Sequence, residues 1–391
     1  MTLKGVNRRM HMIIHNATVV TPAGIMRNMS LAIEDGIIAK ITEGNLPSNG
    51  NSVDAGGNYV VPGFIDMHSD AIEKEIEPRP GAIFPMQVAI YELDKRLASC
   101  GVTTIYHSIS FAESEEGSRS NTRAAEIIWK LTGLAPFMKV HTKIHARYEI
   151  TDIDALPFLE ALANDGKLDL LSIMDHTPGQ GQFKEIMTFK DYYGRVYRQT
   201  EEQLEKLITR KVHAKKTLGE DSLKSVISLC RSSRIPLASH DDDTLEKIQW
   251  LKSQGIAISE FPVTMDAARA ASEHGLAVCF GAPNVLRGNS QTGNLSARQA
   301  LSAGYGDVIC SDYSPMSMLH AVLALVRCGL RPLHEAVNMA CLNPAKILGI
   351  ADMTGSVEEG KIADLVLVNA SGEVPLVMKT FVAGKEVYST C

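Results

Sequence analysis

The most informative segment of this chain reads Val60-Val61-Pro62-Gly63-Phe64-Ile65-Asp66-Met67-His68-Ser69-Asp70. An apolar run is interrupted by Pro62-Gly63, resumes, and ends in polar residues at alternate positions. Residues i and i+2 of a β-strand share a face, so we expect Asp66, His68 and Asp70 to point the same way. Imidazole nitrogens and carboxylate oxygens are ligands of divalent cations, so the segment predicts part of a metal site at a strand end.

Three later apolar runs end in residues of the same kind. They close with Asp175-His176, with His240-Asp241-Asp242-Asp243 and with Asp312. A single residue of this type is more often a hydrogen-bonded core histidine or a helix-capping aspartate. Four strand ends together favour a shared metal site, because a parallel barrel collects the carboxyl ends of its strands on one face. Whether Asp241, Asp242 and Asp243 cap a helix or orient the ligands is left open by the sequence.

The middle of the chain alternates strand and helix signals. Strands are expected to end near Ile65, Ile105, Glu149, Ile173, Leu237, Ile258, Val278 and Ile309, with helices over 86–100, 121–131, 223–232, 245–254 and 267–274. Eight such units predict an α/β fold, a (β/α)8 barrel of the TIM type over residues 61–350. The charged stretch 183–219 has few strand-forming residues, and we interpret it as an inserted helical excursion that could cover the barrel mouth.

Both ends of the chain have short, strand-like patterns. Asp35-Gly36 lies between two apolar runs, which is a strong hairpin signal. Residues 12–60 and 351–391 are therefore predicted to form one small β-sandwich domain, made from both termini. Residues 1–11 are predicted to be a disordered extension.

Composition restricts the classes of partner. The net charge is −6 and the pI is about 6.1, which disfavours nucleic acid and membrane surfaces as partners. Seven cysteines without a C-x-x-C pair indicate reduced thiols and a cytoplasmic protein. No apolar stretch reaches the ~20 residues of a membrane span. We expect a small-molecule partner; the sequence leaves homo-oligomer formation open.

The segment His145-Ala146-Arg147-Tyr148-Glu149 adds a further strand end with charged residues. Alternation places His145, Arg147 and Glu149 on one face of the strand. Glu149 could bridge two cations while Arg147 meets an anion. The alternative is a plain ion pair between Arg147 and Glu149, and the sequence does not separate the two.

The sequence resembles the amidohydrolase superfamily. The resemblance lies in residues 62–68, in the split terminal domain and in Gly360-Lys361-Ile362-Ala363-Asp364-Leu365-Val366. Within the superfamily it is similar to hydrolases of phosphonate metabolism, through residues 68–70, 77–80, 174–180, 238–242, 260–262, 281–288 and 311–313. Most superfamily members have a second histidine where this chain has Asp70. A carboxylate there favours manganese, iron or magnesium somewhat more than imidazole would.

This resemblance implies a metal-dependent hydrolase of alkylphosphonate catabolism that cleaves a ribose triphosphate and releases pyrophosphate. It implies one or two divalent ions, of zinc, manganese or iron, with magnesium as an alternative. The implied ligands are His68, Asp70, Glu149, His176, His240 and Asp312. Bound to the cations, a water molecule would ionise near neutral pH. Asp312 would be the catalytic residue that takes its proton.

A polyphosphate substrate needs local positive charge on this acidic protein. The expected substrate-binding residues are Lys74, Arg79, Arg147, Gln182, Asn284 and Arg287. Gln182 ends a glycine-containing loop after His176, where backbone N–H groups could approach phosphate oxygens, although ordinary turn formation also explains the glycines. Two other functions stay open: hydrolysis of a C–N bond, in a cyclic amide or a deamination substrate, and a metal-free scaffold role.

Overall fold

The computed structural model describes residues 12–47, 51–79, 81–112, 120–181, 183, 185–197, 200–291 and 293–390. Its larger part is a barrel of eight parallel strands, paired in chain order. The strands are β6 (Phe64–Ser69), β7 (Val102–Phe111), β8 (His141–Glu149), β9 (Leu170–Met174), β10 (Leu237–His240), β11 (Ile258–Glu260), β12 (Ala277–Gly281) and β13 (Val308–Cys310). A bridge between Ser69 and Asp312 joins the last strand to the first. The predicted barrel is therefore confirmed.

One strand differs in length from the prediction. β7 continues to Phe111, well beyond the expected end near Ile105. His107, Ser108 and Ser110 interrupt the apolar pattern there, yet all three are buried. The Ser108 hydroxyl accepts a hydrogen bond from the Ser69 backbone N–H at 3.1 Å, so the barrel interior provides a polar partner that the local sequence does not reveal.

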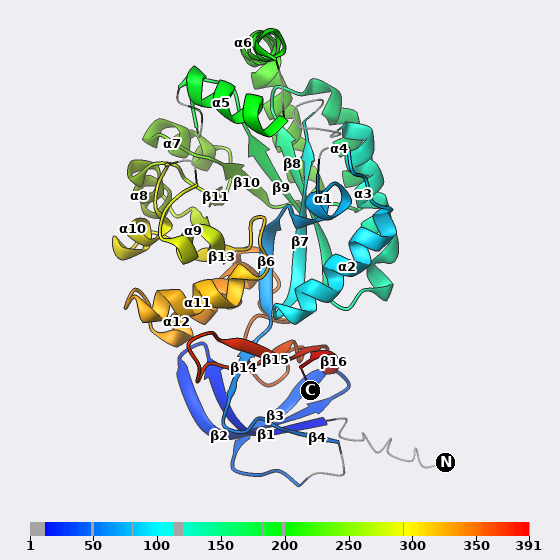
Figure 1. Ribbon diagram of the computed structural model, residues 1–391, viewed down its shortest axis with the longest axis vertical. Coiled ribbons are helices and arrows are strands. Elements are labelled where there is room, and N and C mark those ends of the chain that lie inside the picture. The colour runs from blue at the N-terminus through cyan, green and yellow to red at the C-terminus, as the bar shows by residue number, and fades with distance from the viewer. Residues whose placement is uncertain are drawn as a thin grey trace.

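Helices surround the barrel, as Figure 1 shows. They are α1 (Ala71–Ile76), α2 (Met86–Ser99), α3 (Asn121–Leu134), α4 (Leu156–Asn164), α5 (Ile186–Tyr197), α6 (Glu201–Ser233), α7 (Leu245–Ser253), α8 (Met265–Glu273), α9 (Ala282–Arg287), α10 (Ala297–Ser302), α11 (Ser317–Arg327), α12 (Leu333–Ala340) and α13 (Leu342–Ile347), with 3-10 turns at Ala135–Phe137 and Ile153–Ala155. The helices predicted over 86–100, 121–131, 245–254 and 267–274 are present. The one predicted over 223–232 is the end of a much longer helix, α6.

The charged stretch after β9 is helical, as predicted. It forms α5 and the first part of α6, which begins at a capping box between Thr200 and Gln203. Phe183 and Phe189 pack with Leu204 into a small apolar cluster of their own. In Figure 1 these two helices lie at the upper end of the molecule, where the barrel strands end. The excursion therefore lies next to the carboxyl ends of the barrel strands.

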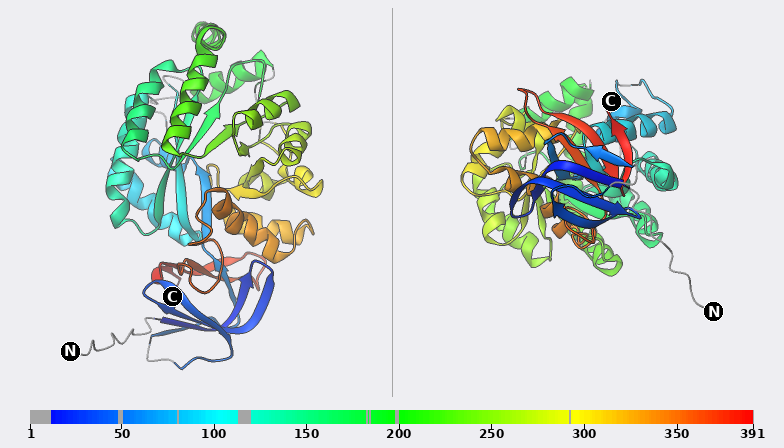
Figure 2. Two further views of the ribbon diagram at one scale, coloured as in Figure 1. Left: turned by 180° about the vertical axis from the view of Figure 1, so that it is seen from behind. Right: turned by 90° about the horizontal axis from the view of Figure 1, so that it is seen from below.

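Strands from both termini form a second sheet at the opposite end of the barrel (Figures 1 and 2). They are β1 (Met12–Thr21), β2 (Gly24–Glu34), β3 (Ile37–Glu43), β4 (Ser52–Asp54), β5 (Tyr59–Pro62), β14 (Leu365–Asn369), β15 (Leu376–Val382) and β16 (Lys385–Ser389). β5 pairs with β14, so the two ends of the chain share one continuous sheet. The predicted hairpin forms, with positive φ at both Asp35 and Gly36.

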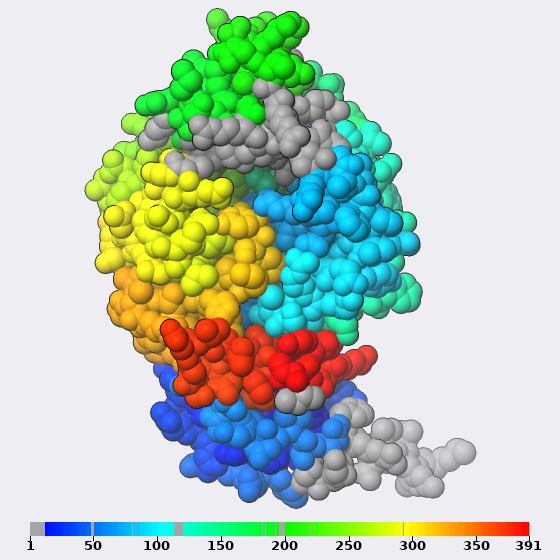
Figure 3. Space-filling view, in the orientation of Figure 1, coloured from blue at the N-terminus to red at the C-terminus, as the bar shows by residue number. Residues whose placement is uncertain are grey.

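The terminal sheet folds over a core to which both ends of the chain contribute. Ile14 and Leu31 from the first strands pack with Leu365 and Phe381 from the last ones. In Figure 3 the C-terminal strands lie between the N-terminal strands and the barrel. The domain limits 12–60, 61–350 and 351–391 stay predictions, and residues 1–11 lie outside the described residues. None of the described helices is long and apolar enough to cross a membrane.

The chain enters the barrel at Gly63, between β5 and β6. A Cβ atom at this position would lie 2.1 Å from Thr103 Oγ1, on fully buried β7. The Gly63 N–H donates to the Asp364 carbonyl at 2.8 Å, which ties the entry point to the C-terminal strands. Only glycine allows the backbone to pass this close to the first two barrel strands.

This close approach predicts a stability difference between two glycine substitutions. Gly63→Ala should destabilise the fold by about 1–3 kcal/mol, because the new methyl group overpacks against Thr103. Gly133→Ala is the control: Gly133 lies in α3 with no atom within 4 Å of the added Cβ. That change should stabilise by about 0.5–1 kcal/mol, as alanine is the better helix former. Thermal unfolding of both variants tests this, and an unchanged melting temperature for Gly63→Ala would contradict it.

Candidate active site

The six predicted metal ligands all lie at the carboxyl end of the barrel. They are His68 and Asp70 at the end of β6, Glu149 at the end of β8, His176 after β9, His240 at the end of β10 and Asp312 after β13. Backbone hydrogen bonds fix the first and last strands here. The Asp70 N–H donates to the Asp312 carbonyl at 2.9 Å, and the Asp312 N–H donates to the His68 carbonyl at 3.0 Å.

Two of these residues meet an unpredicted third one, Glu260, at the end of β11. Glu260 Oε2 lies 3.1 Å from His68 Nδ1 and 3.4 Å from His240 Nδ1. All three side chains are buried, and Phe261 packs edge-on against both imidazoles. Glu260 Oε1 has no hydrogen-bond partner among the described residues. The ligand atoms of the three residues converge, and a cation bound to both carboxylate oxygens of Glu260 would also engage Oε1, so the residues fit a metal ion.

A second group of converging ligand atoms shares His240 with the first. Asp241 Oδ2 lies 3.8 Å from His240 Nε2 and 3.7 Å from His176 Nε2. Asp241 has a φ of 53°, a left-handed backbone conformation. Each group has its three ligand atoms within 4.8 Å of one another.

The two groups differ in protonation. Burial and the nearby charge of Arg147 hold the pKa of His68 and of His240 well below the usual value, so both rings are neutral. Neutral imidazole is the form that binds a cation. Burial works against a charge on His176, but hydrogen bonds to Asp241 and Glu149 raise its pKa to about 9. A cation bound by His176 would have to displace a proton from that ring.

Glu149 is held by several side chains. Its Oε2 lies 3.0 Å from His176 Nδ1, and its Oε1 accepts a hydrogen bond from Thr151 Oγ1 at 3.0 Å. Lys211 from α6 places its Nζ 3.5 Å from the same Oε1. Burial works against ionisation of Glu149, but Lys211 and His176 lower its pKa to about 2. The carboxylate is therefore ionised and already has a positive partner.

The sequence left open an ion pair between Arg147 and Glu149. Among the described residues, no such ion pair forms. Arg147 Nη2 lies 3.5 Å from His240 Nε2 instead. His145, on the same strand face, lies 3.9 Å from Glu260 Oε2 through its Nε2. These contacts place His145, Arg147 and Glu149 on the inner face of the barrel, as strand alternation predicts.

The environment of Asp312 suits the proton transfer predicted for it. Burial, and then the negative charge of Asp70, raise the pKa of Asp312 to about 7. A general base works best with a pKa near the working pH. The catalytic role of Asp312 stays a prediction, and its carboxylate has the acidity that the role requires.

The predicted substrate-binding residues lie in different environments. Lys74 Nζ is 4.5 Å from the centre of the Tyr313 ring, and Arg287 Nη1 donates to the Tyr313 hydroxyl at 2.5 Å. Arg79 is exposed. The side-chain amide of Asn284 bonds to the backbones of Leu295 and Ala297, which indicates a structural task. Gln182 lies outside the described residues.

The three aspartates after His240 have separate tasks. Asp241 faces His176 and His240, whereas Asp242 accepts from the hydroxyls of Ser239 and Ser259 and lies 2.9 Å from Lys247 Nζ. Asp243 accepts from the Gly181 N–H at 2.9 Å. The cap of α7 is Thr244, so helix capping does not explain the aspartates.

The sequence analysis assigned no role to Glu260, Lys211 or Tyr313, and it left the role of Asp241 open. Glu260 had a signal, because it closes a predicted strand just as His240 does. Lys211 had none, since it is one of many charged residues in a long helix. Its burial, at 1% exposed, appears only in the folded chain.

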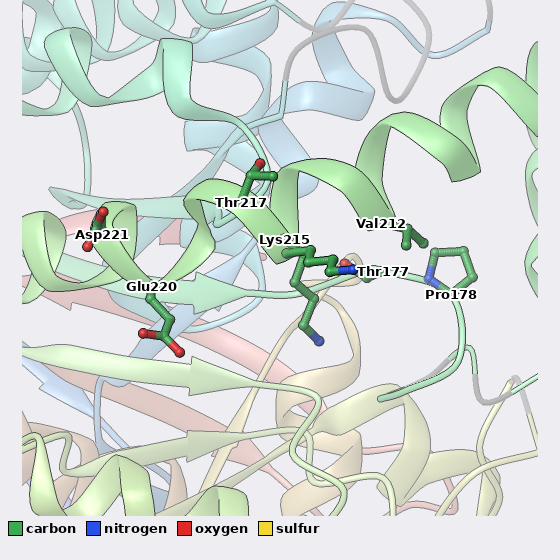
Figure 4. Close-up of a pocket in the computed structure, with 8 residues that line it drawn as sticks. Thr177, Pro178, Val212, Lys215, Thr217, Glu220 and Asp221 are labelled. Carbon is green, nitrogen blue, oxygen red and sulfur yellow. The ribbon is translucent and has the colours of Figure 1, made fainter.

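A cavity of about 650 Å³ adjoins the site between α6 and the loop after β9 (Figure 4). It is lined by Thr177, Pro178, Val212, Lys215, Lys216, Thr217, Glu220 and Asp221. Lys215 Nζ lies 2.9 Å from Asp175 Oδ2, directly before His176 in the chain. The excursion therefore forms one wall of a hollow beside the candidate metal ligands.

Comparison with known proteins identifies the class. The model of the amidohydrolase family matches residues 143–387, so the chain belongs to this family. Its metal-ligand-type residues at the barrel's carboxyl end agree with a metal-dependent hydrolase.

Individual relatives cover nearly the whole chain. An alpha-D-ribose 1-methylphosphonate 5-triphosphate diphosphatase from Escherichia coli (strain K12) is 30% identical over 96% of this chain and 100% of its own length. An imidazolonepropionase from Kosmotoga olearia is 25% identical over 90% of this chain and 87% of its own length. A dihydroorotase from Thermoanaerobacter sp. (strain X514) is 25% identical over 92% and 88%.

Solved structures agree on the fold. An L-hydantoinase from Arthrobacter aurescens superposes with a TM-score of 0.60 at 16% identity, covering 97% of this chain and 96% of its own. An N-acetylglucosamine-6-phosphate deacetylase from Pasteurella multocida gives a TM-score of 0.62 at 13% identity, covering 96% and 98%. At these identities the likeness concerns the fold alone.

The sharing of His240 between both ligand groups predicts that its removal affects metal binding most. His240→Ala should weaken binding of a divalent cation at least about tenfold. Loss of a residue that only hydrogen-bonds to a metal ligand already lowers affinity by about this factor, and loss of a ligand itself should cost no less. His274→Ala is the control: this histidine follows the end of α8 and bonds to the Ala270 carbonyl of that helix. Elemental analysis and metal titration of both variants measure the effect, and equal metal content would count against the site.

Proposed function

We propose that this protein hydrolyses the triphosphate of alpha-D-ribose 1-methylphosphonate 5-triphosphate, releasing pyrophosphate, as a step of alkylphosphonate catabolism. The relative that carries this name aligns along its entire length with the present chain. The observation that carries the proposal is a pair of cationic side chains, Lys74 and Arg287, gathered on Tyr313 beside Asp312.

This pair suits an anionic substrate. Lys74 and Arg287 are both exposed at the barrel mouth, and the intervening aromatic ring keeps them near the carboxyl end of β13. Lys74 Nζ also lies 4.0 Å from Oδ1 of Asp70, one of the candidate metal ligands, so the cationic pair is next to the candidate metal site. Phosphate oxygens bind such groups through charge-assisted hydrogen bonds. Since the protein as a whole is acidic, local charge has to hold a triphosphate.

The chemistry divides among named residues. His68, His240 and Glu260, with His176 and Asp241 adjacent, would hold the metal ion, whose Lewis acidity polarises the phosphate and makes a nearby water more acidic. The Asp312 carboxylate accepts a proton from that water while the oxygen of the water forms a bond to the α-phosphorus. The bond from the α-phosphorus to the bridging oxygen breaks, and pyrophosphate leaves with that oxygen. Arg147 and the Lys74–Arg287 pair offset the negative charge that develops.

A second candidate function is hydrolysis of a C–N bond in a cyclic amide. It is supported by the names of two other relatives, an imidazolonepropionase and a dihydroorotase, at lower identity. Both functions use the metal-ligand residues and differ in their need for cations at the mouth. An uncharged cyclic amide makes no use of Lys74 and Arg287, and one with a single carboxylate has far less negative charge for them to hold than a triphosphate.

Substitution of the mouth cations tests the phosphate function. Arg287→Ala and Lys74→Ala should each lower kcat/KM for pyrophosphate release roughly ten- to a hundredfold, because each loses a charged contact worth about 1.5–3 kcal/mol. Arg269→Ala is the control, since Arg269 pairs with Asp266 on the exposed face of α8 and such pairs contribute little. Metal content should stay the same in all three variants.

A direct comparison of substrates decides between the two functions. Purified, metal-loaded protein is assayed for pyrophosphate release from the ribose 5-triphosphate and for opening of a panel of cyclic amides. Efficient turnover of an amide, with the triphosphate left intact, would overturn the diphosphatase proposal and leave the barrel and its metal site in place.

A further inference from the structure

Lys211 enters the candidate metal site from outside the barrel. It belongs to α6, the long helix of the excursion, yet its side chain is only 1% exposed. Its Nζ lies 3.5 Å from Glu149 Oε1, at the end of β8. A buried ammonium next to a buried carboxylate compensates charge that would otherwise be costly to remove from water.

Glu149 is the carboxylate that a second cation would be expected to use. Both of its oxygens already have partners in the chain. Oε1 receives the Thr151 hydroxyl and faces Lys211, and Oε2 faces His176 Nδ1. A divalent ion at Glu149 would also lie close to the positive Lys211, and like charges repel strongly in a site with little water.

His240 can serve only one of the two ligand groups, so a second cation depends on other residues. Its Nδ1 faces Glu260, and its Nε2 faces Asp241, so each ligand group would use a different nitrogen of one ring. A neutral imidazole offers one lone pair to a cation, because its other ring nitrogen bears the proton. Only one of the two groups can therefore use this ring, and a second cation would depend on Glu149 and His176 instead.

We propose that the site holds a single divalent cation and that Lys211 provides the second positive charge, in the place beside Glu149 where a second cation would bind. The proposal rests on the metal-dependent hydrolase function above and specifies its metal centre. It also gives the helical excursion a task. Through Lys211, α6 places a positive charge beside Glu149 at the carboxyl end of the barrel.

The number of bound cations tests this without any substrate. Wild type, Lys211→Met, Lys211→Arg and Lys206→Met are loaded with excess Mn²⁺, freed of unbound metal and subjected to elemental analysis. Lys206 is the matched control, because it lies on the same helix but pairs with Glu202 at the surface. We expect about one cation per chain in wild type, Lys211→Arg and Lys206→Met, and about two in Lys211→Met, whose Glu149 has lost its ammonium.

A second variant covers the case in which Lys211→Met does not fold. The double change Lys211→Met with Glu149→Gln removes both charges together, so it leaves no unpaired buried ion, and we expect about one cation per chain. Two cations in wild type, one in folded Lys211→Met, or two in the double variant would overturn the role of Lys211. No bound cation in wild type would overturn the metal centre itself. Wild-type protein that binds one cation but releases no pyrophosphate from the triphosphate would overturn only the diphosphatase function.

Discussion

Buried negative charge is the constraint on which the functional end of this molecule depends. Glu149 and Glu260 are completely buried at the ends of two barrel strands, and Asp312 is packed beside Asp70. Carboxylates in such surroundings must be protonated, paired with cations or bound to metal. The chain uses the first two within its own residues: burial raises the pKa of Glu260 to about 7, whereas Lys211 keeps Glu149 ionised. The metal ion that we propose would supply the third.

The barrel makes this concentration of charge feasible by fixing the strand ends. The backbone hydrogen bonds between Asp70 and Asp312, and between Asp312 and His68, hold the first and last strands together at the rim. Side chains from distant parts of the sequence then meet at fixed distances. The terminal sheet supports the other end of the barrel, where Thr380 donates its hydroxyl proton to the Ala98 carbonyl. Stability and chemistry are thus located at opposite ends of the same strands.

Segments outside the barrel strands, among them the excursion between β9 and β10, form the surroundings of the candidate ligands. The excursion places Lys211 beside the candidate ligand Glu149 and forms a wall of the neighbouring cavity, whereas Lys74 and Arg287 lie on α1 and α9. The metal-ligand residues would serve many hydrolytic reactions, including cleavage of amides. Cationic side chains on the helices around the barrel mouth would make such a site bind phosphate groups. Under the proposed function, the substrate class would depend more on these surrounding segments than on the strands.

The sequence by itself determined the barrel and the sheet formed by both termini, because both rest on local patterns. It also placed six candidate ligands at strand ends, whose role as ligands stays a prediction. Strand alternation places His68 and Asp70, and Asp35-Gly36 specifies its hairpin without help from distant residues. Only the tertiary structure decided that Glu260 joins His68 and His240, that Glu149 pairs with Lys211 and not with Arg147, and that Asn284 bonds to backbone. The reason is physical: burial and pairing of a charge depend on contacts between residues far apart in the chain. No pattern within one segment encodes those distances.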